Sequence, residues 1–253
     1  MEFDGKNVVV TGATSGIGKS TAQGFVSAGA RVAAVARRKN ELEQLSSLFA
    51  HGRMLSIPAD LTSPEQRKNC VAQILEKLGN VDILVHAAGI IASGTIENTA
   101  QADWDRMMNI NLTSVFDLTQ QLLPTLIQRK GNIVCVSSVA GLRSFPGVLA
   151  YSVSKAALDQ FTRCVALELA PKGVRINAVN PGVVVTGLHR NGGMNEEQYQ
   201  AFLERSKTTH PLGRVGTSEE IADLILFLAS DRASWITGGT YSIDGGRALT
   251  CAR

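Results

Sequence analysis

The chain has 253 residues, of which 44% are hydrophobic and 19% are charged, and its formal net charge is +3. This composition is typical of a soluble globular protein, and the length accommodates one α/β domain with a large core. The small net charge is spread along the chain, which argues against a nucleic-acid partner.

The chain ends and the cysteines predict where the protein works. The N-terminal segment 1–6 has no cationic region followed by an apolar core, so we expect no secretory signal, and no apolar run is long enough to span a bilayer. The C-terminal segment 251–253 matches neither a prenylation box nor a peroxisomal tripeptide. The 4 cysteines lie far apart without C-x-x-C spacing, which predicts free thiols and no metal site. We therefore expect a cytoplasmic protein.

Short β-branched runs alternate with longer helical segments along the chain. The predicted strands are Asn7–Thr11, Arg31–Ala36, Arg53–Pro58, Val81–His86, Gly131–Ser137, Val174–Asn180 and Thr240–Ile243. The predicted helices are Ile17–Ala28, Asn40–Ala50, Pro64–Leu78, Ala102–Gln128, Ala150–Leu169 and Ser218–Ala229. Several strands are continuously apolar, which is typical of strands buried on both faces of a parallel sheet. We predict an α/β fold for residues 1–253: a doubly wound Rossmann fold, single domain, with a central parallel seven-stranded sheet. Ligands then bind beyond the carboxyl ends of the strands.

A glycine-rich turn follows the first predicted strand. The segment Thr11–Gly18 places glycines at 12, 16 and 18, directly before a helix. These glycines allow a tight turn and a close approach of the backbone to a pyrophosphate, while the helix N-terminus offers free N–H groups. Thr14 and Ser15 can add hydroxyl donors. The spacing is G-x-x-x-G-x-G rather than G-x-G-x-x-G, and glycine spacing alone also occurs in ordinary strand–helix turns.

The end of the second predicted strand indicates which dinucleotide binds. An acidic residue there suits the ribose of NAD, whereas an arginine suits the 2′-phosphate of NADP. Here the strand runs into Arg37-Arg38-Lys39. We therefore predict NADP(H), with Arg37 as the first phosphate ligand and Arg38 as the second. The alternative is a solvated basic turn that opens a helix.

Tyr151 and Lys155 lie one helical turn apart in the predicted helix Ala150–Leu169. A phenol has a pKa near 10, and a nearby ammonium favours its phenolate. Tyr151 could then exchange a proton with a carbonyl or alcohol oxygen, while Ser138, at the end of a strand, orients that oxygen. Lys155 could also hold the nicotinamide ribose. On its own, an exposed Tyr/Lys pair on a helix is common.

Together these motifs resemble the short-chain dehydrogenase/reductase family, in particular its 3-oxoacyl-reductase-like members, over essentially the whole chain. The family's T-G-x-x-x-G-x-G turn matches Thr11 to Gly18, which accounts for the spacing, and its Y-x-x-x-K matches Tyr151 and Lys155. The resemblance implies that Asn111, Ser138, Tyr151 and Lys155 are catalytic, with Asn111 holding a water in a proton relay. The cofactor-binding residues that the motifs and the resemblance together predict are Gly12, Thr14, Ser15, Gly16, Ile17, Gly18, Arg37, Arg38, Asp60, Leu61, Ala88, Gly89, Tyr151, Lys155, Pro181, Gly182, Val184 and Thr186.

One position departs from the family's pattern. The family carries N-N-A-G or N-A-A-G after its fourth strand, whereas this chain has His86-Ala87-Ala88-Gly89. A neutral histidine can donate one hydrogen bond and accept another, so we expect His86 to brace the structure rather than to take part in catalysis.

The substrate pocket is expected to form from the segments 90–94, 140–149 and 187–213, the last as a mobile lid with a short helix. Leu142, Phe145, Val148 and Leu149 predict a partly apolar pocket, and Arg143 could meet a carboxylate, a phosphate or a thioester carrier, or lie solvated on the rim. His210-Pro211-Leu212-Gly213-Arg214 recurs in relatives with different substrates, so the substrate stays open.

We therefore predict an enzyme, an NADP(H)-dependent carbonyl reductase that acts on a small-molecule carbonyl or secondary alcohol. The alternatives are an NAD-dependent alcohol dehydrogenase and, in a different class, a non-catalytic nucleotide-binding sensor or scaffold with the same fold. All four catalytic residues being present argues against the sensor or scaffold. The resemblance implies a homotetramer (or homodimer) formed through the helices 102–128 and 150–169 and the C-terminal region, with no membrane or nucleic-acid partner.

Overall fold

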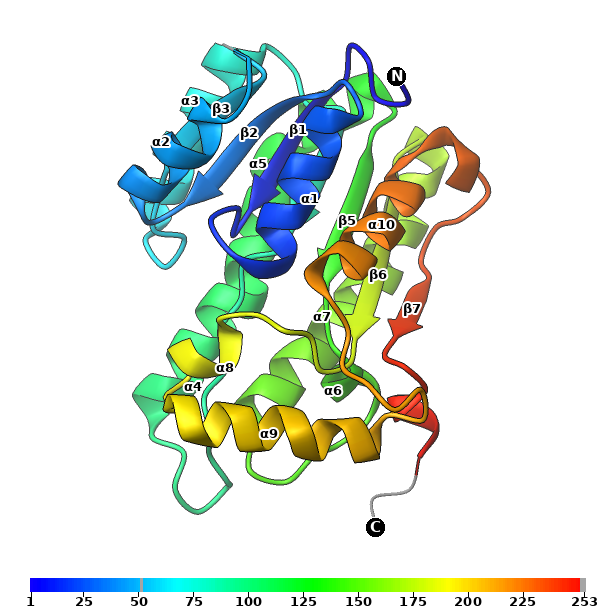
Figure 1. The fold of residues 1–253 in the computed structure, drawn as a ribbon. Helices are drawn as coiled ribbons and strands as arrows, with labels where there is room; N and C mark the ends of the chain where they lie inside the picture. The colour runs from blue at the N-terminus through cyan, green and yellow to red at the C-terminus, as the bar shows by residue number, and fades with distance from the viewer. Residues whose placement is uncertain (51, 251–253) are drawn as a thin grey trace.

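The computed structural model describes residues 1–50 and 52–250 of the chain. Its centre is a parallel sheet of seven strands in the order β3-β2-β1-β4-β5-β6-β7, which confirms the predicted doubly wound fold (Figure 1). The strands are β1 (Asn7–Thr11), β2 (Arg31–Ala36), β3 (Met54–Pro58), β4 (Ile83–His86), β5 (Asn132–Val136), β6 (Arg175–Pro181) and β7 (Thr240–Ile243). Strands β1, β4 and β5 are buried along their whole length, as their continuous apolarity predicts.

Helices cover both faces of the sheet. They are α1 (Gly16–Ser27), α2 (Lys39–Ser47), α3 (Pro64–Leu78), α4 (Gln101–Met108), α5 (Ser114–Arg129), α6 (Val139–Leu142), α7 (Leu149–Leu169), α8 (Leu188–Asn191), α9 (Glu196–Thr209) and α10 (Ser218–Ala229). Helices α1, α2 and α10 pack on one face with Val8 and Val10 of β1, and α3, α5 and α7 pack on the other with Val9. Alternate residues of one strand thus enter different cores, as the pleat requires.

The predicted helix Ala102–Gln128 is not one helix. A π-helical segment, η1 (Asn109–Thr113), separates α4 from α5. A π segment adds a residue to the turn and rotates the side chains around it, and such segments occur often at functional sites. Apolar spacing gave no sign of this interruption, because the chain stays helical on both sides of it.

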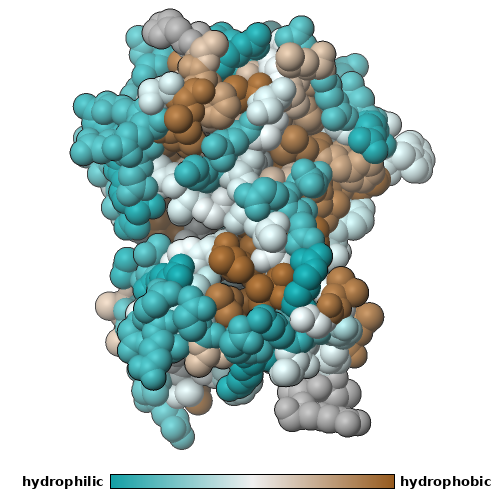
Figure 2. All heavy atoms as spheres, in the orientation of Figure 1, coloured by the Kyte–Doolittle hydropathy of each residue, from teal (hydrophilic) through white to brown (hydrophobic). Residues whose placement is uncertain are grey.

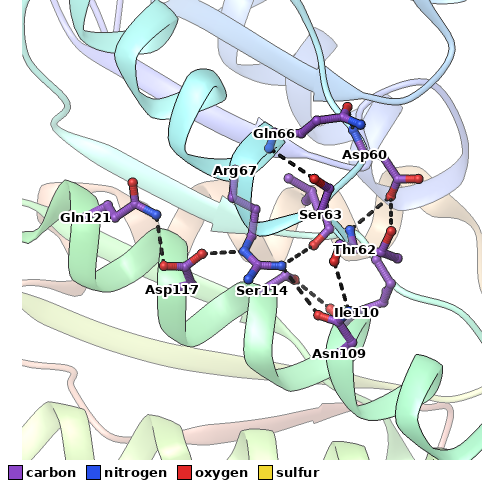
Figure 3. Close-up of polar contacts among 11 residues, drawn as sticks. Asp60, Thr62, Ser63, Gln66, Arg67, Asn109, Ile110, Ser114, Asp117 and Gln121 are labelled. Carbon is purple, nitrogen blue, oxygen red and sulfur yellow. Dashed lines mark hydrogen bonds and ion pairs between the residues drawn. The ribbon is translucent and has the colours of Figure 1, made fainter.

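A buried polar cluster fixes the loop after β3 to this π segment (Figure 3). Arg67 on α3 is 4% exposed, forms an ion pair with Asp117 on α5 and donates to the Leu61 carbonyl over 2.7 Å. Asn109 donates to the Thr62 carbonyl over 3.0 Å. The loop that starts at Asp60 is therefore held to α3 and α5 through Arg67, and to the π segment through Asn109.

The segments that follow β6 and β7 lie beyond the carboxyl ends of the strands (Figure 1). Helices α8 and α9 lie there, together with the C-terminal turn that follows β7. The predicted lid 187–213 thus contains two helices rather than one. Among the described residues, no helix is long and apolar enough to cross a membrane.

Candidate active site

A cleft of about 840 Å³ opens between the carboxyl ends of the strands and the segment α8–α9. Its walls come from the glycine turn, the ends of β2, β4, β5 and β6, helix α7, and the inner face of α9. The space-filling view shows an indentation between the upper body and the part around α9, with hydrophobic residues beside it and hydrophilic residues around it (Figure 2). A cleft of this size and position is where a doubly wound sheet binds a dinucleotide.

The glycine turn is packed so tightly that side chains are excluded at two positions. A Cβ atom added to Gly12 would lie 2.8 Å from the Ala87 carbonyl oxygen, and one added to Gly18 would lie 2.4 Å from the Gly12 oxygen. Gly12 also has φ +69°, which glycine adopts without strain. The turn therefore brings the N-terminus of α1 close to the cleft, where its free N–H groups can face phosphate.

Thr11 joins the glycine turn to the end of β4. Its hydroxyl accepts hydrogen bonds from the Ala87 and Ala88 N–H groups, both over 3.1 Å, and donates to the Val85 carbonyl over 3.3 Å. Thr11 thereby fixes the loop that follows β1 to the loop that follows its neighbour in the sheet, β4.

Two arginines from the end of β2 line the same part of the cleft. Arg38 is already engaged, because it donates to Thr14 over 3.2 Å and pairs with Glu41 over 2.8 Å. No ion pair of Arg37 is found within the described residues, so its guanidinium is the more available of the two. The order of the two residues as phosphate ligands stays a prediction.

Asp60 does not line the cleft, although Leu61 and Thr62 do. Its carboxylate accepts hydrogen bonds from the N–H and the hydroxyl of Thr62, over 2.9 and 2.8 Å. Burial raises the pKa of Asp60, but the hydrogen bonds from Thr62 and the charges of Arg37 and Arg106 lower it, and the net direction is down. The carboxylate therefore shapes the loop that carries Leu61 and Thr62.

The segment that follows β6 is held in place by two side chains, Tyr199 on α9 and His210 at the C-terminal end of α9. Tyr199 is fully buried, and its hydroxyl donates to the Thr186 carbonyl over 2.9 Å and accepts from the Thr186 N–H over 3.2 Å. His210 accepts from the Val183 N–H at Nε2 over 3.1 Å, so its proton lies on Nδ1, which faces the Ser206 carbonyl at 2.6 Å. Pro181, Gly182, Val184 and Thr186 all line the cleft.

Ser138, Tyr151 and Lys155 come together at one end of the cleft. All three are at least nine-tenths buried. The ammonium of Lys155 donates to the Val136 carbonyl over 2.8 Å and lies 5.8 Å from the centre of the Tyr151 ring. The Ser138 side chain lies beside Tyr151 and acts to lower the pKa of the phenol. The strand end of β5 and the first turn of α7 thus place the three groups around one point.

The protonation of this group is set mainly by burial. Burial raises the pKa of Tyr151 above its usual value of 10, against the effect of the Ser138 side chain, which lowers it. Burial lowers the pKa of Lys155 to about 8, against the negative charge of Asp159, which raises it. At neutral pH Tyr151 is therefore a phenol and most Lys155 is an ammonium. We had expected the ammonium to favour the phenolate, but burial outweighs that effect here.

Asn111 lies behind the cleft rather than on its wall. It exchanges two hydrogen bonds of 3.0 Å with the backbone of Ile90 and donates to Ser154 over 3.0 Å. A Cβ atom added to Gly89 would lie 3.4 Å from the Asn111 carbonyl oxygen and 3.6 Å from the Lys155 ammonium. The π segment therefore brings Asn111 next to Lys155, across the glycine that ends the β4 loop.

A buried carboxylate that we did not predict supports the catalytic group. Asp159 is 2% exposed and lies one turn after Lys155 on α7. The Asn180 amide donates to both Asp159 oxygens, over 3.1 and 2.9 Å, and to the Ser138 carbonyl over 3.0 Å. Its spacing of four from Lys155 was a signal that sequence reasoning could have used.

His86 braces the sheet, as expected. It is 2% exposed, does not line the cleft, and hydrogen-bonds through Nε2 to the Thr119 hydroxyl over 2.9 Å. Burial lowers the pKa of His86 to about 3, so the ring is neutral and joins β4 to α5.

The structure thus brings together the predicted catalytic and cofactor-binding residues, with Asp60 and Asn111 just behind the wall. Of the residues predicted for an apolar substrate pocket, Phe145 and Val148 line the cleft, whereas Leu142 and Leu149 do not. Arg143 does not point at a substrate, because its guanidinium donates to the Ala248 carbonyl over 2.9 Å and to those of Arg247 and Thr250. Sequence reasoning missed Tyr199, Asp159 and Asn180, and it gave no role to His210.

The chain is similar to known reductases and dehydrogenases over almost its whole length. A family model described as enoyl-(acyl carrier protein) reductase matches residues 12–248. The 3-oxoacyl-(acyl-carrier-protein) reductase of Thermotoga maritima is 39% identical over 252 residues, which are 98% of this chain and 100% of that protein. The meso-2,3-butanediol dehydrogenase of Serratia marcescens is 35% identical over 246 residues, which are 97% of this chain and 96% of that enzyme.

Solved structures share the fold in detail. A crystal structure of a short-chain dehydrogenase/reductase of unknown function from Caenorhabditis elegans, with cofactor, superposes with a TM-score of 0.94 at 34% identity. The match covers 100% of this chain and 98% of that one. The described relatives act on different compounds, so likeness alone leaves the substrate open.

Proposed function

The chain belongs to the short-chain dehydrogenase/reductases, and on that premise we propose that it is an NADP(H)-dependent oxidoreductase of the carbonyl reductase type. It transfers a hydride between the nicotinamide and a carbonyl or secondary alcohol carbon, with Tyr151 as the general acid or base. The observation that carries the proposal is one continuous cleft with the glycine turn and Arg37 at one end and Ser138, Tyr151 and Lys155 at the other.

The residues of the cleft fit a dinucleotide. The missing side chains of Gly12, Gly16 and Gly18 leave the backbone free to approach a pyrophosphate, and Arg37 is available for a 2′-phosphate. When bound, the cofactor supplies or accepts the hydride. Thr186 and Val184 also line the cleft, with the Thr186 side chain beside Gly16.

The side chains at that end handle the proton and the substrate oxygen. In reduction, the Tyr151 hydroxyl donates its proton to the oxygen of the carbonyl, and Ser138 donates a hydrogen bond that holds the same oxygen in place. The raised pKa of Tyr151 keeps the phenol protonated at neutral pH, which is the form that reduction needs. The Lys155 ammonium stabilises the phenolate that forms, and Asn111 holds the loop beside it. The buried phenol is therefore ready to donate its proton in reduction.

Oxidation of NADPH, followed by its absorbance, tests the reaction against ketones, diketones, 3-oxoacyl thioesters and steroids. We expect Tyr151→Phe to lower kcat by at least about 100-fold, because general acid catalysis contributes that much or more. Tyr241→Phe is the matched control, since no hydrogen bond of the Tyr241 hydroxyl is found in the described residues. Absence of turnover in both directions, with tight binding of NADPH, would favour a non-catalytic nucleotide-binding protein.

The choice of cofactor is tested by Arg37→Ala. We expect it to weaken the binding of NADPH by about tenfold or more and that of NADH much less, because the guanidinium meets only the extra phosphate. An equal effect on both cofactors would favour an NAD-dependent alcohol dehydrogenase.

We also propose a cytoplasmic homotetramer or homodimer. Exposed apolar side chains support the assembly, because Phe116 lies on α5 and Val153 and Leu167 lie on α7, the helices predicted to form the interfaces. Sedimentation that gives a monomer mass would refute it, and fractionation of cells tests the location.

A further inference from the structure

All charged side chains of the described residues that line the cleft are cationic. They are Arg37, Arg38, Arg106, Arg205, Arg247 and the catalytic Lys155. No aspartate or glutamate of the described chain lies on the wall. A cleft lined by one sign of charge concentrates ligands of the opposite sign.

Apart from Arg38 and Lys155, these cations form two pairs at opposite ends of the cleft. Arg37 and Arg106 lie near the loop after β3, since their charges lower the pKa of Asp60, and this is the end where a dinucleotide phosphate is expected. Arg205 on α9 and Arg247 in the turn after β7 line the other end, where Arg247 lies over the Phe145 ring. A dinucleotide phosphate accounts for the first pair but not for the second.

Arg247 is held at the mouth of the substrate end by a built turn. Its guanidinium carbon lies 5.1 Å from the centre of the Phe145 ring, which also lines the cleft. Arg143 holds the turn by donating to its backbone carbonyls. The neighbouring acid, Asp244, is committed to the backbone, because it accepts from the Gly246 N–H over 3.0 Å and from the Ala248 N–H over 2.6 Å.

Arg205 reaches the same place from the lid. It lies on the face of α9 that borders the cleft, together with Phe202, Ser206 and Thr209 at helical spacing. Burial is the main cause of the lowered pKa of Arg247, and the charges of Arg143 and Arg205 add to it. No ion pair of Arg205 or Arg247 is found among residues 1–50 and 52–250. Two neighbouring guanidiniums repel each other unless an anion lies between them.

We propose that the substrate carries an anionic group, a carboxylate or a phosphate, which Arg205 and Arg247 bind while its carbonyl lies at Tyr151. Phe145 and Phe202 contact the apolar part of the substrate that lies between its anionic group and its carbonyl. The inference rests on the proposed reaction, and it narrows the substrate to a ketone or secondary alcohol with an acidic group at a distance from the reacting carbon.

The test compares anionic ketones with neutral ones of the same length. The probes are methyl ketones with a terminal carboxylate on chains of increasing length, their methyl esters, and one ketone with a terminal phosphate. We expect the best carboxylate or phosphate to exceed its neutral partner in kcat/KM. Arg205→Gln and Arg247→Gln should each lower that preference by about tenfold, the usual effect of a lost charge-assisted hydrogen bond. A greater preference for the phosphate or for the carboxylate identifies which group the pair recognises.

Lys207→Gln is the matched control, because it removes a positive charge from the same helix at a position that does not line the cleft. The preference for anionic over neutral ketones should be the same in Lys207→Gln as in the wild type. If esters react as well as acids and both arginine variants keep the wild-type preference, the inference is wrong, although the proposed reaction stands.

A binding measurement separates this inference from the reaction itself. Octanoate and octanamide are titrated calorimetrically into the protein with and without NADP⁺. We expect octanoate to bind the wild type more tightly than octanamide does, and Arg205→Gln and Arg247→Gln to remove the difference. Equal binding of the two compounds by the wild type overturns the inference even if no ketone is turned over.

Discussion

The two ends of the cleft are built in different ways. At the glycine turn, backbone packs directly on backbone, with Gly12 against Ala87 and Gly18 against Gly12. At the lid, only Tyr199 and Ser206 of the 14 residues of α9 are buried, so a few side chains hold it to the body. The first arrangement leaves no room for movement, whereas the second can open locally at low cost. An end that binds a cofactor common to many enzymes can be rigid, and an end that admits a particular substrate needs access.

Alanine substitution of a glycine in each region tests this difference most strongly. Gly18→Ala should destabilise the protein by about 3 kcal/mol, because the new methyl group would overlap the Gly12 backbone. Gly187→Ala in the lid should change stability by less than about 0.5 kcal/mol, since nothing lies nearer than 3.5 Å to the added atom. Unfolding in urea measures both. Similar losses in the two variants would show that the ends do not differ in packing.

Removal of one arginine from each region should give the next largest difference. Arg67→Met should cost about 2 kcal/mol, because it leaves Asp117 unpaired in a partly buried position. Arg190→Met removes an exposed ion pair with Glu196 in the lid and should lower stability far less, because solvent screens such a pair. The measurement is urea unfolding of each variant and of the double variant Arg67→Met/Asp117→Leu. Full stability of Arg67→Met would mean that the buried cluster does not hold the β3 loop.

Tyr199→Phe loosens the lid alone. It removes the hydroxyl that joins α9 to both backbone groups of Thr186, at a cost of about 1 kcal/mol. Because Thr186 borders the cleft, we expect KM for the cofactor to rise several-fold with a smaller change in kcat. Steady-state kinetics check this, beside the Tyr241→Phe control. An unchanged KM would show that the position of Thr186 does not depend on the lid.

Asp159→Asn should have the smallest effect at neutral pH. The charge of Asp159 raises the pKa of Lys155, which burial lowers to about 8, so its loss lowers that pKa further. The proposed mechanism needs the ammonium, and activity on the alkaline side should therefore fall at a lower pH than in the wild type. The pH profile of kcat measures the shift. A purely structural role for Asp159 would lower activity equally at every pH.

Local patterns in the sequence predicted the repeating part of the fold well. The bounds of β1, β2, β7, α3 and α10 agree with the prediction, since apolar runs and capping residues such as Ser63 and Thr217 mark them. The π segment was not predicted, because one added residue in a helix leaves the apolar spacing on each side intact. That residue nevertheless decides where Asn111 points.

The amino-acid sequence by itself determined the alternation of strands and helices along the chain, the glycine turn, the Tyr151–Lys155 pair and the basic end of β2. These features depend on residues close together in the chain, whose spacing fixes their geometry. The tertiary structure alone decided that Arg143 holds the C-terminal turn and that Arg205 and Arg247 line the same cleft. Such contacts join segments tens of residues apart, so no local spacing contains them, and only the packing of the whole chain brings them together.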